Sequence, residues 1–317
     1  MKSNSVSPAR RAAFEILMRV AEGAYASVLL ASREDDLQPL DRALCHELVM
    51  GVLRRQLWLD RLIEHYANRK VAELDVAVAV TLRLGLYQLR FLSRVPASAA
   101  VNESVNLIHS ARLRSAGGLV NAILRRATRE AEVDPTTNIR DPLERLSVDT
   151  SHPEWLIERW TKAFGAAEAA AFARANNEPA PVAFRVVTTH AVAAEVCERL
   201  RQSGAELVPS KIVSGAWRVT GAGSLLSELV SAGQVYLQDE ASQLVAGSLD
   251  AQPDQRVLDL CAAPGSKTTH IADLTGDSAL IVASDLHKHR LGTVVTTAQL
   301  QDLKSIRCVA LDGLHPL

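Results

Sequence analysis

Apolar residues in the first 130 positions recur every three or four residues, which is the spacing of a helix with one buried face. Two such series are Phe14, Leu17 and Met18, and Leu44, Leu48 and Val52. The apolar and polar alternation that is typical of a strand is almost absent from this part of the chain. The pattern therefore predicts an all-α domain with about five or more helices.

The breaks between these helices fall at glycine, proline and capping residues. They are Gly23 after the first helix, Asp41 as a possible N-cap of a segment over residues 41–66, Pro96 after residues 82–92, and Gly117-Gly118 before residues 119–129. Residues 130–145 are polar and contain proline, which is typical of a linker. We therefore assign residues 1–135 to the helical domain.

The pattern changes in the middle of the chain, where helical and strand-like segments alternate. Helical spacing occurs at residues 154–164 and 191–203, and short β-like runs occur at residues 182–188 and 216–220. This mixture predicts a small α+β linker domain over residues 136–233.

Apolar runs and helical segments alternate regularly from residue 255 onward. The order is apolar run, glycine-containing turn, helix, apolar run, helix, apolar run, over residues 256–260, 268–274, 280–284, 287–303 and 306–311. A βαβαβ order implies parallel strands joined by right-handed crossovers. Residues 234–317 are therefore predicted to form part of an α/β, Rossmann-like domain.

Composition narrows the class of protein. The 317 residues, 48% of them hydrophobic, suffice for about two packed domains and exclude a wholly disordered chain. No apolar run approaches the roughly 18 residues of a membrane helix, and the first residues lack the apolar stretch of a signal peptide. The four cysteines lie far apart with no CxxC pair, so we expect reduced thiols and no structural metal. A cytoplasmic protein without a membrane segment is expected.

The net charge of −1 conceals an asymmetry along the chain. Residues 1–130 carry 19 Lys and Arg against 13 Asp and Glu, whereas the remainder carries 16 against 23. Of the 19 cations, 17 are Arg, the side chain suited to bidentate phosphate contacts. A nucleic-acid partner and an ordinary solvated helical surface both fit this excess.

One segment, residues 257–270, places a tight turn between a predicted strand and a predicted helix. Backbone N–H groups and a helix N-terminus at such a turn can receive the polar end of a nucleotide-like cofactor. A phosphate-binding Walker A loop requires glycines where Cys261 and Ser266 stand, and a dinucleotide GxGxxG turn fails because Gly265 is the only glycine. A turn that binds nothing is the remaining alternative.

The same segment resembles motif I, DxCAAPGGKT, of RNA 5-methylcytosine methyltransferases. Further similarity lies in residues 151–160, 175–181 and 236–245. The helical domain resembles the antitermination factor NusB in residues 41–51, 82–89, 100–105 and 120–125. A NusB-like domain before this motif is typical of the RsmB (Sun/Fmu) branch, which methylates small-subunit ribosomal RNA. The resemblance covers residues 8–313.

The resemblance implies that S-adenosylmethionine is the cofactor and ribosomal RNA the partner. The implied cofactor-binding residues are Cys261, Ala262, Ala263, Pro264, Gly265, Ser266, Lys267, Asp285 and Asp312. In the family, the loop wraps the methionine portion, Asp285 holds the ribose hydroxyls, and Asp312 lies near the adenine. An acidic side chain at the end of a parallel strand can accept ribose O–H donors, although it can also be merely a cap. Arg290 stands where members of the family often carry Arg, but a solvated position on a helix explains it equally well.

The family's catalytic cysteines lie in DxPCSG and TCS motifs, and neither motif occurs in this sequence. We therefore assign no catalytic residue and expect a C-terminally truncated, inactive form. Cys261 belongs to the cofactor loop by resemblance, and the other three cysteines are expected to be small buried hydrophobes. The first strand of the last sheet should present an exposed apolar edge that favours association. Two departures from the family pattern are Ser266 in motif I and Val187 where Asn is common.

Three hypotheses follow. The chain belongs to an S-adenosylmethionine-dependent rRNA cytosine-C5 methyltransferase and lacks its catalytic half-sheet. Alternatively, it is a non-catalytic NusB-like RNA-binding or antitermination module. As a third possibility, the partial domain binds the cofactor without turnover.

Overall fold

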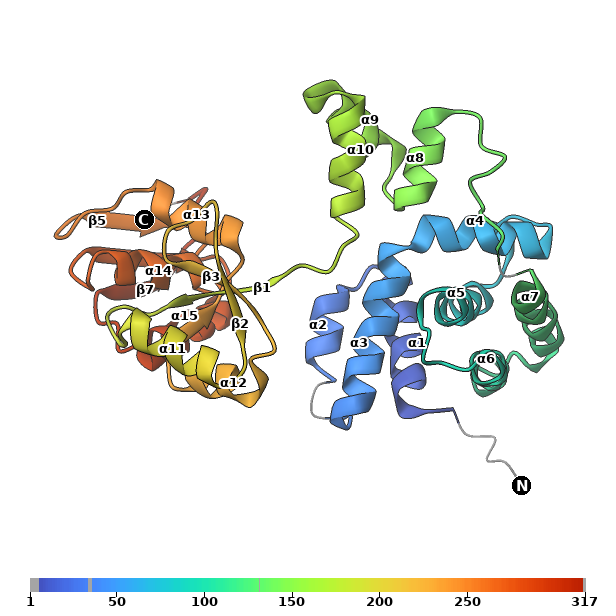
Figure 1. The fold of residues 1–317 in the computed structure, drawn as a ribbon, viewed down its shortest axis with the longest axis horizontal. Helices are drawn as coiled ribbons and strands as arrows, with labels where there is room; N and C mark the ends of the chain where they lie inside the picture. The colour runs from blue at the N-terminus through green and yellow to red at the C-terminus, as the bar shows by residue number, and fades with distance from the viewer. Residues whose placement is uncertain (1–5, 34–35, 131, 316–317) are drawn as a thin grey trace. The chain divides into compact units, whose positions relative to one another are not determined.

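The computed structural model describes residues 6–33, 36–130 and 132–315. The chain divides into two compact units, Met1–Pro179 and Ala180–Leu317, and each is considered by itself (Figure 1). Among the described residues, no helix has both the length and the apolar character needed to cross a bilayer.

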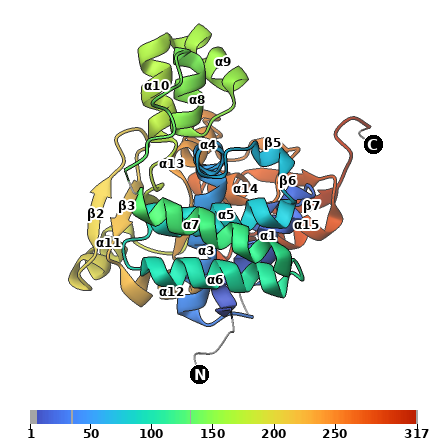
Figure 2. The ribbon, with the colours of Figure 1, turned by 90° about the vertical axis from the view of Figure 1, so that its right-hand side faces the viewer.

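The first unit is helical, as its periodicity predicts. Its first seven α-helices are α1 (Pro8–Ala21), α2 (Ala26–Ala31), α3 (Pro39–Arg54), α4 (Gln56–Ala67), α5 (Val76–Phe91), α6 (Ala97–Ser110) and α7 (Gly117–Arg129). Helix α5 is the most apolar of them and packs against α1, α3, α4, α6 and α7. Figure 2 shows α5, α6 and α7 lying side by side. Burial of α5 on all sides explains why its sequence is apolar all round rather than along one stripe.

Two details of this domain differ from the sequence-based expectation. Residues 41–66 form two helices, because the chain leaves helical geometry at Arg55 between α3 and α4. Asp41 lies in the first turn of α3, whose N-cap is Gln38, so the predicted N-cap is wrong. The glycine pair at residues 117–118 is the first turn of α7 rather than a break before it.

Three more helices complete the first unit: α8 (Pro142–Thr150), α9 (Glu154–Phe164) and α10 (Ala166–Ala175). Helix α8 packs on α4, and the backbone N–H of Trp58 donates to Ser151 Oγ at 3.1 Å. These contacts join residues 142–175 to the preceding helices, whereas the sequence places them with the α+β domain. The structural division at residue 179 therefore differs from the predicted boundary at residue 135.

The second unit opens with a four-stranded antiparallel sheet of order β2-β3-β1-β4. Its elements are β1 (Val182–Val186), α11 (Ala193–Gln202), β2 (Glu206–Pro209), β3 (Ala216–Thr220), α12 (Gly223–Ser231) and β4 (Val235–Leu237). Arg185 in β1 is paired in register with Tyr236 in β4. Because β4 is hydrogen-bonded to β1, this sheet extends past residue 233, where the sequence predicts the boundary.

A parallel sheet of order β5-β6-β7 follows, as the βαβαβ pattern predicts. Its elements are α13 (Glu240–Ser248), β5 (Arg256–Asp259), α14 (Ser266–Leu274), β6 (Leu280–Asp285), α15 (Lys288–Leu300) and β7 (Ile306–Ala310). Within the described chain, β5 is paired only with β6, and its Leu258 is 56% exposed. The predicted apolar strand edge is therefore present.

Candidate cofactor site

The loop between β5 and α14 is held at its base by one carboxylate. Asp259, the last residue of β5, accepts a hydrogen bond from the Thr268 hydroxyl at 2.7 Å and one from the Cys261 N–H at 3.3 Å. The Ala262 N–H donates to the Ser284 carbonyl of β6 at 2.8 Å. The loop is thus fixed to its own strand, to the following helix and to the neighbouring strand.

Gly265 ends this loop in a conformation that favours glycine. Its φ is +104°, in the left-handed region, and it is the N-cap residue of α14. A Cβ at this position would lie 3.1 Å from Val294 Cα in α15. Glycine therefore allows both the sharp turn into α14 and the close approach of α15.

Asp285 lies at the carboxyl end of β6, and its side chain is 5% exposed. Its carboxylate accepts from the His287 N–H at 3.1 Å and from Arg290 Nη1 at 3.3 Å. Arg290 Nη2 also donates to the Ala263 carbonyl at 3.2 Å. Arg290 therefore joins the loop to Asp285, which distinguishes it from a solvated helix residue.

A cavity of about 600 Å³ opens between these groups. Four of the predicted site residues line it: Cys261, Ala263, Asp285 and Asp312. Asp312 is exposed just after β7, and its carboxylate accepts from the Leu314 N–H at 3.0 Å. The parallel order of β5, β6 and β7 brings these residues to one edge of the sheet.

The other five predicted residues do not line the cavity. They are Ala262, Pro264, Gly265, Ser266 and Lys267. Several further residues line the cavity that were not predicted from the sequence, namely Leu260, Leu286, His287, Arg290, Leu311, Gly313 and Leu314. Most of these directly follow a strand or a residue already assigned, and their position after strand ends is the signal that would have found them.

The cysteines fall into two groups. Cys45 and Cys197 are buried in α3 and α11, as expected, and burial raises the pKa of Cys45 to about 11. Cys261 is exposed in the loop. Cys308 is also exposed, so the expectation that it is buried was wrong, because β7 is exposed from its second residue to its last.

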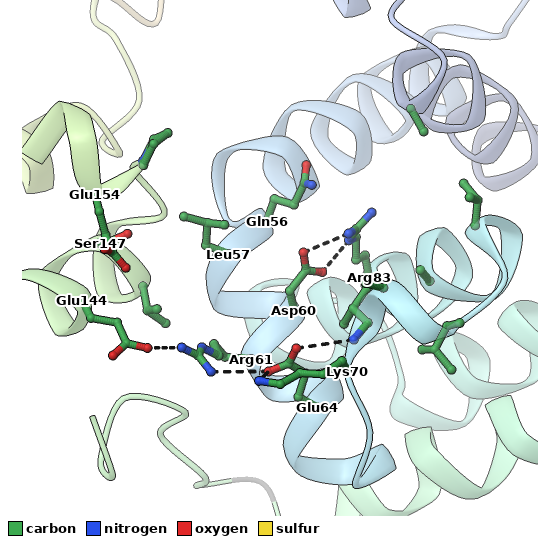
Figure 3. Close-up of a pocket in the computed structure, with 18 of the residues that line it drawn as sticks. Gln56, Leu57, Asp60, Arg61, Glu64, Lys70, Arg83, Glu144, Ser147 and Glu154 are labelled. Carbon is green, nitrogen blue, oxygen red and sulfur yellow. Dashed lines mark hydrogen bonds and ion pairs between the residues drawn. The ribbon is translucent and has the colours of Figure 1, made fainter. Parts of the chain in front are cut away.

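A second cavity, of about 850 Å³, lies in the first unit between α4, α5, α8 and α9 (Figure 3). Its three cations are each paired with a carboxylate: Arg83 with Asp60, Arg61 with Glu64 and Glu144, and Lys70 with Glu64. Since these cations are already neutralised, the cavity has no surplus positive charge for an anionic ligand. The charged residues that line this cavity therefore form a structural ion-pair network.

Comparison with known families gives three matches along the chain. Residues 7–129 match the NusB family, residues 152–225 match the RsmF/B-like ferredoxin-like domain, and residues 246–316 match the 16S rRNA methyltransferase RsmB/F family. Their order agrees with the helical bundle, the four-stranded antiparallel sheet and the parallel sheet described above.

Full-length comparisons extend these matches. A Bacillus subtilis protein named "Probable ribosomal RNA small subunit methyltransferase B" is 33% identical over 99% of this chain and 70% of its own length. A Synechocystis protein with the same name is 36% identical over 97% of this chain and 70% of its own. The chain belongs to the RsmB/F family of ribosomal RNA methyltransferases. The resemblance found from the motif and from the NusB-like segments is therefore confirmed.

A solved structure supports the same fold for the RsmB/F chain. The crystal structure of PH0851 aligns with a TM-score of 0.73 and 25% identity, covering 97% of this chain and 70% of that one. The predicted order of an all-α NusB-like domain, a small α+β domain and part of an α/β methyltransferase domain is confirmed.

Proposed function

We propose that this chain serves S-adenosylmethionine-dependent methylation of a cytosine C5 in small-subunit ribosomal RNA. Membership of the RsmB/F family supports the reaction class. The observation that carries the cofactor assignment is the buried Asp285 carboxylate at a strand end, facing a cavity that the motif I loop also lines.

The cavity fits this cofactor in size and chemistry. Its volume of about 600 Å³ is within the usual range for small-molecule sites. Asp285 offers carboxylate oxygens to a ribose diol, and Arg290 fixes their orientation. An adenine ring can pack on the apolar side chains that line the cavity, which are those of Leu260, Leu286 and Leu311.

Each group then has a defined task. The segment Cys261–Lys267, which is the loop with the first two residues of α14, holds the methionine portion, Asp285 accepts hydrogen bonds from the ribose hydroxyls, and Asp312 lies near the adenine. When bound, S-adenosylmethionine supplies an electrophilic methyl group on a sulfonium. The chain's own residues bind and orient this group, and none of them is assigned a bond-making role.

Methylation at C5 requires a thiolate that adds to C6 of the cytosine, which makes C5 nucleophilic enough to take the methyl group from the sulfonium. A base then removes the C5 proton, and the thiolate is expelled from C6. The DxPCSG and TCS motifs that carry the family's cysteines do not occur in residues 1–317. A polypeptide of these residues alone is therefore expected to bind the cofactor without turnover.

The RNA partner is proposed from the charge of the first domain. Residues 1–130 have an excess of Arg and Lys, and 17 of the 19 are Arg. A non-catalytic RNA-binding module shares this feature, so RNA binding alone does not separate the two functions. Cofactor binding does, because only the methyltransferase requires it.

The test is calorimetric titration of the chain with S-adenosylmethionine. The unsubstituted chain should bind, and Asp285→Asn should bind at least about tenfold more weakly, since a hydrogen bond to a charged group contributes about 1.5–3 kcal/mol. Asp302→Asn is the control, because Asp302 is 76% exposed and does not line the cavity. No binding by the unsubstituted chain would reject the cofactor assignment and favour the RNA-binding module.

A further inference from the structure

An arginine of the antiparallel sheet is buried against the helix that follows the cofactor loop. Arg185, in β1, has a side chain that is 3% exposed. Its Nη1 lies 3.1 Å from a carboxylate oxygen of Asp273 in α14, whose side chain is 4% exposed. This ion pair connects two sheets that have no hydrogen-bonded strand in common.

The other two nitrogens of this guanidinium also donate hydrogen bonds. Nε donates to Gln238 Oε1 at 3.2 Å, and Nη2 donates to Gln301 Oε1 at 3.2 Å and to the Thr269 hydroxyl at 3.1 Å. The Tyr236 ring lies 5.2 Å from the guanidinium carbon. Arg185 thus contacts residues next to β4, within α14 and at the end of α15.

The second carboxylate oxygen of Asp273 also accepts hydrogen bonds. Its Oδ1 accepts from the Thr188 hydroxyl at 3.1 Å, the Thr189 N–H at 2.9 Å and the Thr189 hydroxyl at 3.0 Å. Burial lowers the pKa of Arg185 to about 10, so it remains charged at neutral pH. Removing one partner of a buried ion pair with this many hydrogen bonds is strongly destabilising, and the intact pair holds its members in one arrangement.

One of these contacts leads to the cofactor loop. The Thr269 hydroxyl accepts from Arg185 and donates to the Gly265 carbonyl at 2.9 Å. The Thr269 N–H donates to the same carbonyl at 2.9 Å. Only one side chain therefore separates the guanidinium from the glycine that ends the loop.

We propose that Arg185 is a positioning residue for the cofactor loop, acting through the Thr269 hydroxyl on Gly265. The antiparallel sheet is then part of what shapes the cofactor site, although none of its residues lines the cavity. The expected effect on S-adenosylmethionine affinity rests on the proposed function. The expected effect on the order of the loop does not depend on any cofactor.

The test uses Thr269, because loss of Arg185 would leave Asp273 buried without its partner and would risk unfolding. Thr269→Val removes the hydroxyl and keeps the shape, and Thr269→Ser keeps the hydroxyl. Thr275→Val is the matched control, since Thr275 is also buried in the same region and its hydroxyl also donates to a carbonyl four residues earlier, that of Ile271, at 3.0 Å.

Hydrogen exchange of the loop amides measures how the Thr269 substitutions change the order of the loop, and it needs no cofactor. The Ala262 and Gly265 amides, which are hydrogen-bonded, should exchange about five- to tenfold faster in Thr269→Val, the equivalent of one hydrogen bond. Thr269→Ser should restore slow exchange, and Thr275→Val should leave these two amides unchanged. Equal exchange in Thr269→Val and the unsubstituted chain, or an equal increase in Thr275→Val, would overturn the proposal.

Titration with S-adenosylmethionine supplies the second measurement. Thr269→Val should bind about five- to tenfold more weakly, and Thr269→Ser and Thr275→Val should bind as the unsubstituted chain does. Unchanged affinity in Thr269→Val, beside normal binding by the unsubstituted chain, would overturn the positioning role. Failure of the unsubstituted chain to bind would count against the proposed function, and the exchange rates would still decide whether the Thr269 hydroxyl, through which Arg185 is proposed to act, orders the loop.

Discussion

Arg290 and Asp285 form an ion pair with 3.3 Å between Nη1 and the carboxylate, and the same guanidinium donates to the Ala263 carbonyl at 3.2 Å. The pair joins two sides of the cofactor cavity, the loop after β5 and the end of β6. Arg290 is about half exposed, whereas Asp285 is buried. The exposed partner therefore orients the buried one, and cofactor binding should depend on both.

Replacement of Arg290 by Met should weaken S-adenosylmethionine binding about threefold to tenfold. The effect is smaller than that of Asp285→Asn because solvent screens a half-exposed ion pair. Calorimetric titration measures the change. Lys288→Met is the control, since it removes a cation from the first turn of the same helix but not from the cavity. Equal losses in the two variants would show that general charge, rather than the contact with Asp285, is responsible.

Gly265→Ala should destabilise the second unit by about 1–3 kcal/mol and abolish cofactor binding. The new Cβ would stand in a left-handed conformation and 3.1 Å from Val294 Cα. Gly292→Ala, within α15, has no atom within 4 Å of its new Cβ and should be stabilising by up to about 1 kcal/mol. Urea denaturation compares the two variants. A neutral effect of Gly265→Ala would contradict the tight approach of α15 to the loop.

His270 should make the second unit less stable in mild acid. Burial, with the nearby Arg185 guanidinium, lowers the pKa of His270 to about 4 from 6.5. Between these values the unfolded chain binds the extra proton, so the free energy of unfolding rises with pH there and falls as pH falls. The loss from pH 7 to pH 5 should be about 2 kcal/mol.

Hydrogen exchange of the α14 amides, corrected for intrinsic rates, measures this loss. His270→Asn should remove about 2 kcal/mol of the difference between pH 7 and pH 5, because Asn does not titrate. Carboxylates that titrate in the same range are common to both chains and cancel in the comparison. The same pH dependence in both chains would contradict the prediction.

Asp60→Ala should destabilise the first unit by about 2–3 kcal/mol. Arg83 makes two bonds to Asp60, at 2.6 and 2.9 Å, and its side chain is only 15% exposed (Figure 3). Removal of the carboxylate leaves a largely buried cation unpaired. Thermal unfolding with Glu158→Ala as control measures the effect, since the exposed pair of Glu158 and Lys162 should contribute less than about 0.5 kcal/mol. Combining Asp60→Ala with Arg83→Met should recover part of the loss.

Much of the fold followed from local patterns. Helix α9 and strand β3 lie at the residues that the sequence predicts for them, and the order of strands and helices after residue 255 is as predicted. Strands β2 and β4 were missed. They span four and three residues, and β2 ends in a proline, so neither carries enough alternation to be recognised. Pairing with β3 and β1 determines them as strands.

The sequence by itself determined the family and the domain order and indicated the proposed cofactor loop, because these depend on contiguous residues whose spacing and turn chemistry are local. Only the tertiary structure decided the contacts of Arg290 and Arg185. Both are long cations whose function depends on the carboxylate they meet, and Asp273 lies 88 residues from Arg185 in sequence. A charged side chain looks the same in sequence whether it is solvated or buried. Its partner, and hence its energetic role, is fixed only when distant segments pack together.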